Sequence, residues 1–272
     1  MNKNSKKYLI ALDVDGTLIN SQDQICPATL NYLKKLKDEG HKVIIASGRP
    51  IRGIRQYYDQ LELDTPAICY NGAYIYPGKE VELNNYKFSF PREIILNIIK
   101  EIGYERLDNI ILETNNDIYL LHEDESLNRY FTKDGMIVHL GKVEDTLKED
   151  TMTMLIKVKD VKDGDLIKSI VEKNKNIKLR FWSGHWYQIS EIYYDHINKA
   201  NALNYICNYY GIPLSDVIAF GDAINDLEIL KEVGYGFAMC NCEDDLRSQV
   251  KLITEFDNNN DGIMHELMKI IK

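Results

Sequence analysis

An apolar run from Tyr8 to Leu12 ends abruptly at two carboxylates, Asp13 and Asp15. An uninterrupted run of this kind is typical of a strand in a parallel sheet, because helices cover both faces of such sheets. Ligands bind at the carboxyl ends of the strands in open α/β sheets, so two acids at this position indicate a binding site. Carboxylates one residue apart can share a divalent cation, and Gly16 permits a tight turn after them.

Three further apolar runs end in polar residues in the same way, over 43–46, 67–70 and 217–220. A helix pattern that begins at Pro27 separates the first run from the second, as in a βαβ unit. We therefore predict an α/β fold with a Rossmann-like core built on a parallel sheet.

The hydrophobic pattern of the sequence changes in the middle of the chain, where helix patterns alternate with strand-like runs such as 154–158. This alternation predicts a separate α+β domain over residues 84–191. The core domain would then consist of residues 1–83 and 192–272. The middle domain is an insertion into it.

Polar residues that follow the second and third runs are candidates for the same site. Ser47, Gly48 and Arg49 stand at a predicted helix start, where a hydroxyl and backbone amides can bind phosphate. The alternative for Ser47 is a simple helix cap. Asn71 belongs to an Asn-Gly pair, which is typical of a hairpin turn but also lies at a strand end.

Two later positions add charge to the predicted site. Lys199 opens a helix pattern, where its charge opposes the helix dipole and so indicates another role, although most helix lysines are simply solvated. Asp222 and Asp226 follow the fourth apolar run, with Asn225 between them. The alternative for Asp222 is an N-cap of the next helix.

Taken in order, YLIALDVDGTL, IIASGRP, the segment around Lys199 and GDAIND resemble the four motifs of the haloacid dehalogenase superfamily of phosphotransferases. The SGR form of the second motif, the NGA segment, the inserted domain and the DNNNDGIM ending resemble the Cof-type branch, which has a type IIB cap. The residues before Lys199, His-Ile-Asn, depart from the GVSKG that is frequent in the family.

The resemblance implies a mechanism and a metal. Asp13 would attack phosphorus and carry an aspartyl-phosphate, while Asp15 would protonate the leaving group and then activate water. Asp13, the backbone carbonyl of Asp15 and Asp222 would bind Mg²⁺, with Asp226 ligating it directly or through water. Lys199 would neutralise the aspartate and the phosphate.

The same resemblance assigns the remaining contacts. Phosphate would be bound by Asp13, Gly16, Thr17, Ser47, Gly48, Lys199 and Asn225. The rest of the substrate would be contacted by Arg49, Asn71, Trp182 and His185. The alternative for Arg49 is that it only ties loops together. For Trp182 and His185 the alternative is a half-buried place on alternating strands, and His185 has no metal-ligand spacing around it.

The predicted function is Mg²⁺-dependent hydrolysis of small phosphorylated metabolites, such as sugar phosphates or nucleotide and cofactor phosphates. A phosphomutase of the same superfamily would share all four motifs but return the phosphoryl group to its substrate. A non-enzymatic phosphoacceptor module would also carry a phospho-aspartate, but it needs neither a second aspartate two residues on nor a large insertion.

The composition of the chain indicates which classes of binding partner and which cellular compartment to expect. A net charge of −9 and a pI near 5.3 argue against nucleic acid and anionic membranes as partners. Five scattered cysteines suit a reducing cytoplasm. The sequence has no run of 18 consecutive apolar residues, so we expect no membrane-spanning helix. Cys240 and Cys242 lack a second pair for zinc, and 258–261 lacks EF-hand spacing. The sequence does not indicate the oligomeric state.

Overall fold

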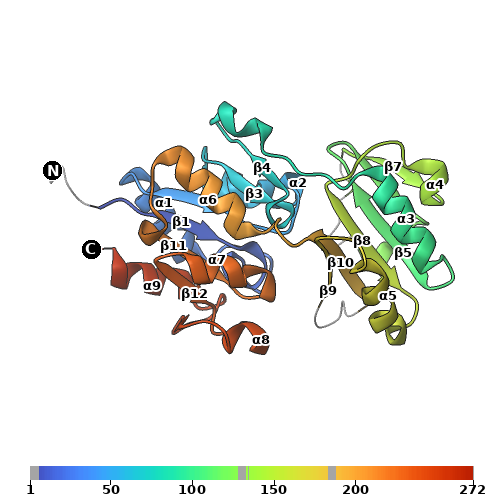
Figure 1. The fold of residues 1–272 in the computed structure, drawn as a ribbon. Helices are drawn as coiled ribbons and strands as arrows, with labels where there is room; N and C mark the ends of the chain where they lie inside the picture. Colours follow the sequence, from blue (N-terminus) through green and yellow to red (C-terminus); the bar gives the residue numbers. More distant parts are fainter. Residues whose placement is uncertain (1–5, 128–132, 134, 183–187, 272) are drawn as a thin grey trace. The chain divides into compact units, whose positions relative to one another are not determined.

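The computed structural model describes residues 6–127, 133, 135–182 and 188–271. The chain forms two compact units (Figure 1): a core unit, residues 1–86 with 198–272, and an inserted unit, residues 87–197.

These limits lie a few residues beyond the expected 84 and 191, for two reasons. Tyr86 accepts a backbone hydrogen bond from Ile75 of the core unit at 3.2 Å. Strand β10 (Ile189–Tyr194) continues past residue 191 and stays paired with its neighbour β9 (Ile177–Phe181). A boundary at 191 would therefore cut a paired strand.

The core unit is built on a parallel sheet, as the apolar runs predict. Every residue of strand β1 is buried, because its neighbours in the sheet and the covering helices leave no face open. The strands, in order across the sheet, are β13 (Leu252–Ile253), β12 (Tyr235–Ala238), β11 (Val217–Gly221), β1 (Leu9–Leu12) and β2 (Lys42–Ile45).

Helices α6 and α7 pack on the sheet face that carries Leu9 and Ala11 of β1 and Val217 and Ala219 of β11. Helices α1 and α9 contact one another, and α1 also contacts β2. The helices of the core unit are α1 (Pro27–Asp38), α2 (Ile51–Gln60), α6 (Lys199–Tyr210), α7 (Leu227–Glu232), α8 (Asp244–Arg247) and α9 (Gly262–Ile270).

The third apolar run does not extend the main ladder as a full strand. Its residues form β3 (Ala67–Cys69), which pairs antiparallel with β4 (Tyr74–Tyr76). A single parallel bridge joins Ala46 to Ile68 and brings the end of β3 beside the end of β2. The residues that follow β3 therefore reach the same edge of the sheet as those that follow β2.

The inserted unit is an α+β domain. Helices α3 (Arg92–Ile102) and α5 (Gly164–Val171) pack on one face of a mixed sheet through an apolar cluster, and α4 (Val143–Thr146) is a short helix. A smaller cluster, which includes Ile111 and Leu155, lies on the other face. Across this sheet the strands are β7 (Ile137–Leu140), β6 (Asp117–Leu120), β5 (Leu107–Glu113), β8 (Thr153–Val158), β10 and β9 (Ile177–Phe181).

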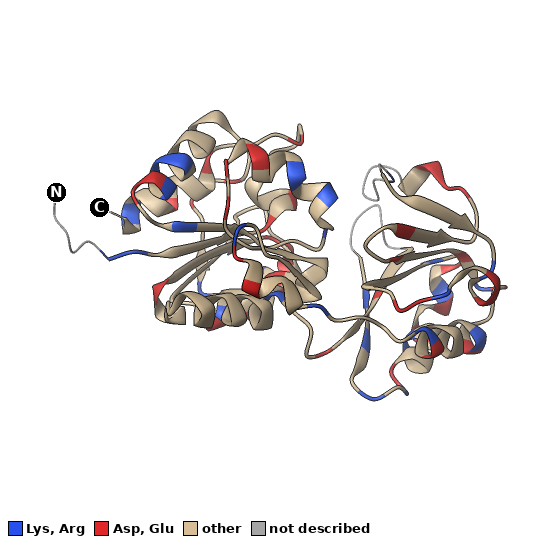
Figure 2. Cartoon of the chain, turned by 90° about the horizontal axis from the view of Figure 1, so that it is seen from above, with Lys and Arg blue, Asp and Glu red and all other residues tan. Residues whose placement is uncertain are grey.

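Basic residues (blue) and acidic residues (red) alternate along the backbone of each unit (Figure 2). Among the residues that the structure describes, no helix is long and apolar enough to cross a membrane.

Candidate active site

Asp13 lies where β1 ends, and its backbone is fixed on both sides. Its N–H donates to the carbonyl of Phe220 on β11 at 3.0 Å, and its own carbonyl accepts from Leu18 at 3.2 Å. The chain between Asp13 and Leu18 makes a tight turn in which Gly16 has φ +69°. A Cβ on Gly16 would lie 2.2 Å from Oδ2 of Asp222, so glycine is required for this close approach.

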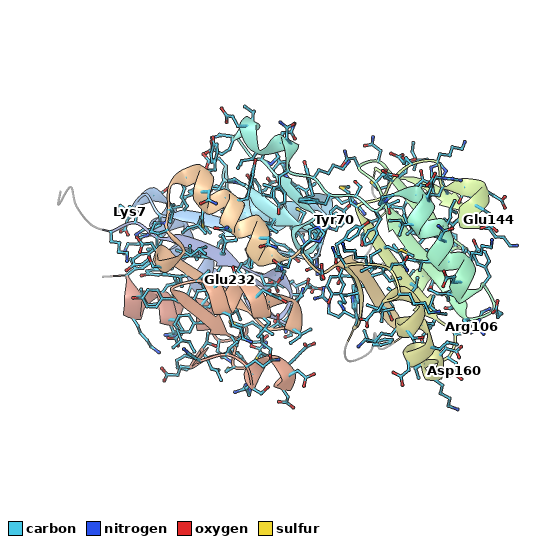
Figure 3. All side chains as sticks on the ribbon, in the orientation of Figure 1. Lys7, Tyr70, Arg106, Glu144, Asp160 and Glu232 are labelled. Carbon is cyan, nitrogen blue, oxygen red and sulfur yellow. The ribbon has the colours of Figure 1, made fainter. Side chains whose placement is uncertain are left out.

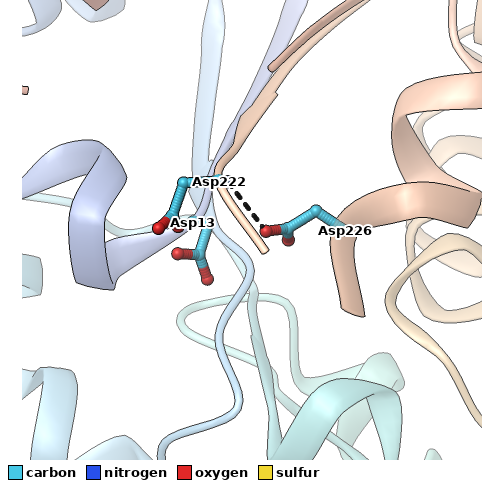
Figure 4. Close-up of side chains that lie close together, drawn as sticks. All are labelled: Asp13, Asp222 and Asp226. Atoms are coloured by element: carbon cyan, nitrogen blue, oxygen red, sulfur yellow. Dashed lines mark hydrogen bonds between the residues drawn. The ribbon is translucent and has the colours of Figure 1, made fainter. Parts of the chain in front are cut away.

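Three carboxylates meet at the carboxyl ends of β1 and β11. Oxygen atoms of Asp13, Asp222 and Asp226 lie within 4.8 Å of one another (Figure 4). Asp226 is fixed by its own neighbours, because its Oδ2 accepts from the backbone N–H of Asp222 at 3.1 Å and of Ala223 at 3.2 Å. The chain thus brings together acids that are more than 200 residues apart in the sequence.

Lys199 bridges two of these acids. Its Nζ lies 2.6 Å from Oδ1 of Asp13 and 2.6 Å from Oδ1 of Asp226, and its side chain is only 1% exposed. It is the first residue of α6, whose cap is Asn198: the Asn198 side chain accepts from the N–H of Asn201 at 2.9 Å. Lys199 is therefore a buried cation at the site and not a solvated helix residue.

Burial and crowding shift the proton affinities of this cluster. Burial raises the pKa of Asp13 to about 7; Lys199 opposes this rise, and Asp226 adds to it. Burial, followed by repulsion from Asp13 and Asp226, raises the pKa of Asp222 well above its usual value. Burial alone would lower the pKa of Lys199, but attraction to Asp13 and Asp226 outweighs it, so this pKa is raised. The cluster lacks positive charge, which a divalent cation would supply.

Asp15 stands apart from the three carboxylates. Its two oxygens receive a bidentate ion pair from Arg49, with Nε at 2.8 Å from Oδ2 and Nη2 at 2.5 Å from Oδ1. The Asp15 side chain is about half exposed (49%), whereas that of Arg49 is 18% exposed. Arg49 thus ties the loop after β2 to the carboxylate of the residue expected to transfer protons. Its contact with substrate stays a prediction.

Hydroxyl groups of the first and second motifs lie close to these acids. Oγ1 of Thr17 donates to Oδ1 of Asp222 at 3.2 Å. Ser47 is buried, and its Oγ accepts from the N–H of Arg49 at 3.1 Å. Ser47 therefore caps the turn that leads to α2, and its position at the end of β2 keeps it at the same edge of the sheet.

Asn71 and Asn225 contact one another directly. Nδ2 of Asn225 donates to Oδ1 of Asn71 at 2.9 Å. Tyr70, labelled in Figure 3, and Asn71 both have left-handed backbone, at φ 49° and 53°, which is uncommon for residues other than glycine. A Cβ on Gly48 would lie 3.0 Å from Oδ1 of Asn71, so Gly48 makes room for this amide.

The two remaining predicted contacts lie on the inserted unit. Trp182 packs against the smaller apolar cluster of that unit, and its backbone N–H donates to the carbonyl of Ile189 at 2.9 Å. This position suits the half-buried alternative. His185 lies outside the described residues.

Sequence reasoning missed Asn241, which contacts the turn between Asp13 and Leu18. The side chain of Asn241 donates to the carbonyl of Gly16 at 2.8 Å. Asn241 stands between Cys240 and Cys242, where the cysteines were the only visible signal.

Buried carboxylates bridged by a lysine, at the carboxyl edge of a parallel sheet that also carries an inserted domain, define a class of α/β hydrolase. The chain belongs to the haloacid dehalogenase-like hydrolases: the model of that family matches residues 10–267. The family that the motifs resemble is thereby confirmed. The chain is an enzyme of a hydrolase and phosphatase family.

Individual relatives agree with this assignment. The chain is 36% identical to 5-amino-6-(5-phospho-D-ribitylamino)uracil phosphatase YitU of Bacillus subtilis over 95% of this chain and 96% of that protein. A haloacid dehalogenase-like hydrolase from Bacteroides thetaiotaomicron has a similar fold, with a TM-score of 0.80 at 24% identity, covering 97% of this chain and all of that one. The HAD subclass IIB sugar phosphatase BT4131 matches with a TM-score of 0.79 at 21% identity over 97% and 99% of the chains.

Proposed function

We propose that the protein is a Mg²⁺-dependent phosphatase that hydrolyses small phosphate monoesters through an aspartyl-phosphate on Asp13. The observation that carries this proposal is the position of Lys199, whose ammonium group is buried and contacts both Asp13 and Asp226. A buried lysine at a carboxylate cluster gives the site a positive charge where phosphoryl oxygens would gather.

The donors at this site suit Mg²⁺. They are hard carboxylate oxygens and they lie close together. Burial raises the pKa of Asp13 and of Asp222, and a nearby cation would favour the ionised forms of both. Asp13 and Asp222 would ligate the ion, with Asp226 beside them. When bound, the ion would shield the phosphate charge from the attacking carboxylate. The side chain of Asp15 is paired with Arg49 outside the carboxylate cluster, so it would not ligate the ion, and we assign it to proton transfer. Only the backbone carbonyl of Asp15 would ligate the ion.

The chain's own residues divide the reaction between them. A carboxylate oxygen of Asp13 forms a bond to phosphorus while the bond to the leaving oxygen breaks, and Asp15 gives that oxygen a proton. Water then attacks the aspartyl-phosphate, Asp15 takes the proton from the water, and phosphate leaves. Arg49 holds Asp15 in place, and Lys199 neutralises charge on the phosphoryl oxygens.

The relatives guide the choice of substrate. YitU is named for a substrate whose phosphate stands on a ribityl chain, and BT4131 is named as a sugar phosphatase. We propose a substrate in which the phosphate is carried by a polyhydroxylated chain, with 5-amino-6-(5-phospho-D-ribitylamino)uracil as the first compound to try. Five free cysteines among the described residues are consistent with work in the cytoplasm.

The test is phosphate release from a panel of phosphate monoesters, measured with Mg²⁺ and with EDTA. Wild type and Asp13→Asn are compared, because the amide keeps the shape of the carboxylate but cannot attack phosphorus. We expect Mg²⁺-dependent release that the variant lacks. Release by Asp13→Asn at the wild-type rate would refute the mechanism. Isomerised phosphate esters in place of free phosphate would indicate a mutase, and a phospho-aspartate that lasts for minutes would indicate a phosphoacceptor.

A further inference from the structure

The proposed phosphatase mechanism gives no role to the DNNNDG segment near the C-terminus or to the turn around Asn241. Yet both contact the nucleophile loop, which we define as residues 13–19. Nδ2 of Asn241 donates to the carbonyl of Gly16 at 2.8 Å. Nδ2 of Asn258 donates to the carbonyl of Ile19 at 2.8 Å, and the N–H of Asn258 donates to Oδ1 of Asn241 at 3.3 Å.

The turn that carries Asn241 is fixed to the strand that carries Asp222. The N–H of Met239 donates to the backbone carbonyl of Gly221, and the N–H of Glu243 donates to the backbone carbonyl of Asp222, each at 2.9 Å. Asn241 lies between these two anchors. Its bond to Gly16 therefore ties the nucleophile loop to the backbone on either side of Asp222.

The bond also fixes the orientation of one peptide group. In a trans peptide the carbonyl and the following N–H point in opposite directions, so holding the Gly16 carbonyl also sets the direction of the Thr17 N–H. Thr17 in turn donates through Oγ1 to Asp222 at 3.2 Å, and the Cα of Gly16 lies against the Asp222 carboxylate. A rotation of this peptide would change the spacing between Asp13 and Asp222.

The DNNNDG segment is held by hydrogen bonds of its own aspartates. Oδ1 of Asp257 accepts from Asn259 and Asn260, and Oδ1 of Asp261 accepts from the N–H and the hydroxyl of Thr29. These bonds fix the backbone from which Asn258 reaches Ile19 and Asn241.

We propose that Asn241 is a positioning residue, braced by Asn258, that holds the Gly16–Thr17 peptide in the orientation needed for phosphoryl transfer. The kinetic part of this inference rests on the proposed phosphatase activity. Its structural part does not. Asn241 is exposed, so replacing it removes the hydrogen bond without opening a cavity.

The test compares three variants. Asn241→Ala removes both hydrogen bonds of the side chain, whereas Asn241→Asp keeps an acceptor for Asn258 but has no N–H to give Gly16. Asn260→Ala is the control, because Asn260 is an exposed asparagine of the same segment whose side chain contacts Asp257. Amide hydrogen exchange is followed over residues 14–20, together with Tm, and kcat and KM for p-nitrophenyl phosphate.

In both Asn241 variants we expect the amides of Leu18 and Ile19 to exchange about tenfold faster, because the turn opens more readily without its brace. We expect kcat to fall about tenfold with KM within about twofold. We expect Tm to stay within about 2 °C of wild type, and Asn260→Ala to match wild type in all readouts.

Two results would overturn the proposal. Wild-type exchange or wild-type kcat in Asn241→Asp would show that the bond to Gly16 is not needed. A parallel fall of Tm and kcat would show a general structural role. If wild type hydrolyses neither p-nitrophenyl phosphate nor any ester of the panel, the proposed function fails, and the exchange measurement still decides whether the brace exists.

Discussion

Nζ of Lys199 lies at the same distance, 2.6 Å, from Oδ1 of Asp13 and from Oδ1 of Asp226. One buried ammonium thus serves two buried carboxylates, while Asp222 stands beside them with a raised pKa. The local charge is balanced only in part, because one ammonium group stands among three carboxylates.

Replacing Lys199 by Met should remove this balance while keeping much of the side-chain volume. Because two carboxylates would lose their buried partner, we expect the free energy of unfolding to fall by about 3 kcal/mol or more. Phosphatase activity should fall by at least about 100-fold. Urea denaturation and phosphate release measure the two effects. Asp226→Asn in the Lys199→Met background should restore part of the stability, and unchanged stability in Lys199→Met would contradict the bridge.

Alanine substitutions at two glycines can distinguish the effect of backbone strain from that of a steric clash with Asp222. Gly16 and Gly211 both have left-handed backbone, at φ +69° and +66°, but a Cβ on Gly211 would meet nothing within 4 Å. Alanine at Gly211 should therefore cost about 1 kcal/mol of unfolding free energy, and alanine at Gly16 should cost more, because a collision with Asp222 adds to the same backbone strain. Only Gly16→Ala should lose activity and Mg²⁺ response, because its Cβ would collide with Asp222. Equal activity in the two variants would argue against the close approach.

The bidentate pair between Arg49 and Asp15 predicts that lysine is a poor substitute. A lysine offers a single ammonium group and cannot hold both oxygens of Asp15, so we expect Arg49→Lys to lower kcat about tenfold. Arg55→Lys is the matched control, since Arg55 pairs with Asp59 in an exposed ion pair on α2, the helix that follows Arg49. Steady-state kinetics on both variants checks the prediction, which fails if the two behave alike.

His41 should make the stability of the fold depend on pH. Its Nδ1 accepts the N–H of Tyr8 at 3.1 Å, so the folded state favours the neutral ring, and burial lowers the pKa of His41 below its usual 6.5. The contribution of His41 to stability is therefore fully present above about pH 6.5 and is lost as the pH falls through the lowered pKa of the folded state.

His41→Asn offers an acceptor at a similar place without a titrating ring. Urea denaturation between pH 7.5 and pH 5 should show a steeper loss of stability in wild type than in this variant. Parallel curves for the two proteins would show that His41 does not carry this pH dependence.

The sequence predicts the frame of this protein well, because the frame depends on patterns that are local. Uninterrupted apolar runs mark β1, β2 and β11, and parallel strands necessarily bring their carboxyl ends to one edge. The convergence of Asp13 with Asp222 follows from that geometry alone. Strand β13 has only two residues, too few to show a periodicity, and it was not predicted.

The partners of polar side chains are harder to predict, since they depend on tertiary contacts that no short pattern encodes. The sequence places Arg49 near the site but does not reveal its pairing with Asp15. Asn71 shows the turn that an Asn-Gly pair predicts, yet its contact with Asn225 requires the positions of two loops 154 residues apart. The bond from Asn241 to Gly16 spans 225 residues in the same way.

The position of β1 in the middle of its sheet has a consequence for synthesis. Of the two neighbours of β1, β2 follows closely in the chain, but β11 begins only at residue 217. Lys199 follows Asp13 by 186 positions, so a ribosome needs roughly 10 to 40 s to supply the lysine. Until β11 has been made, one edge of an apolar strand lacks its partner, which favours aggregation. A nascent chain that ends before Lys199 carries Asp13 without the lysine and the two later aspartates, so the cluster is complete only when the last part of the chain has been made.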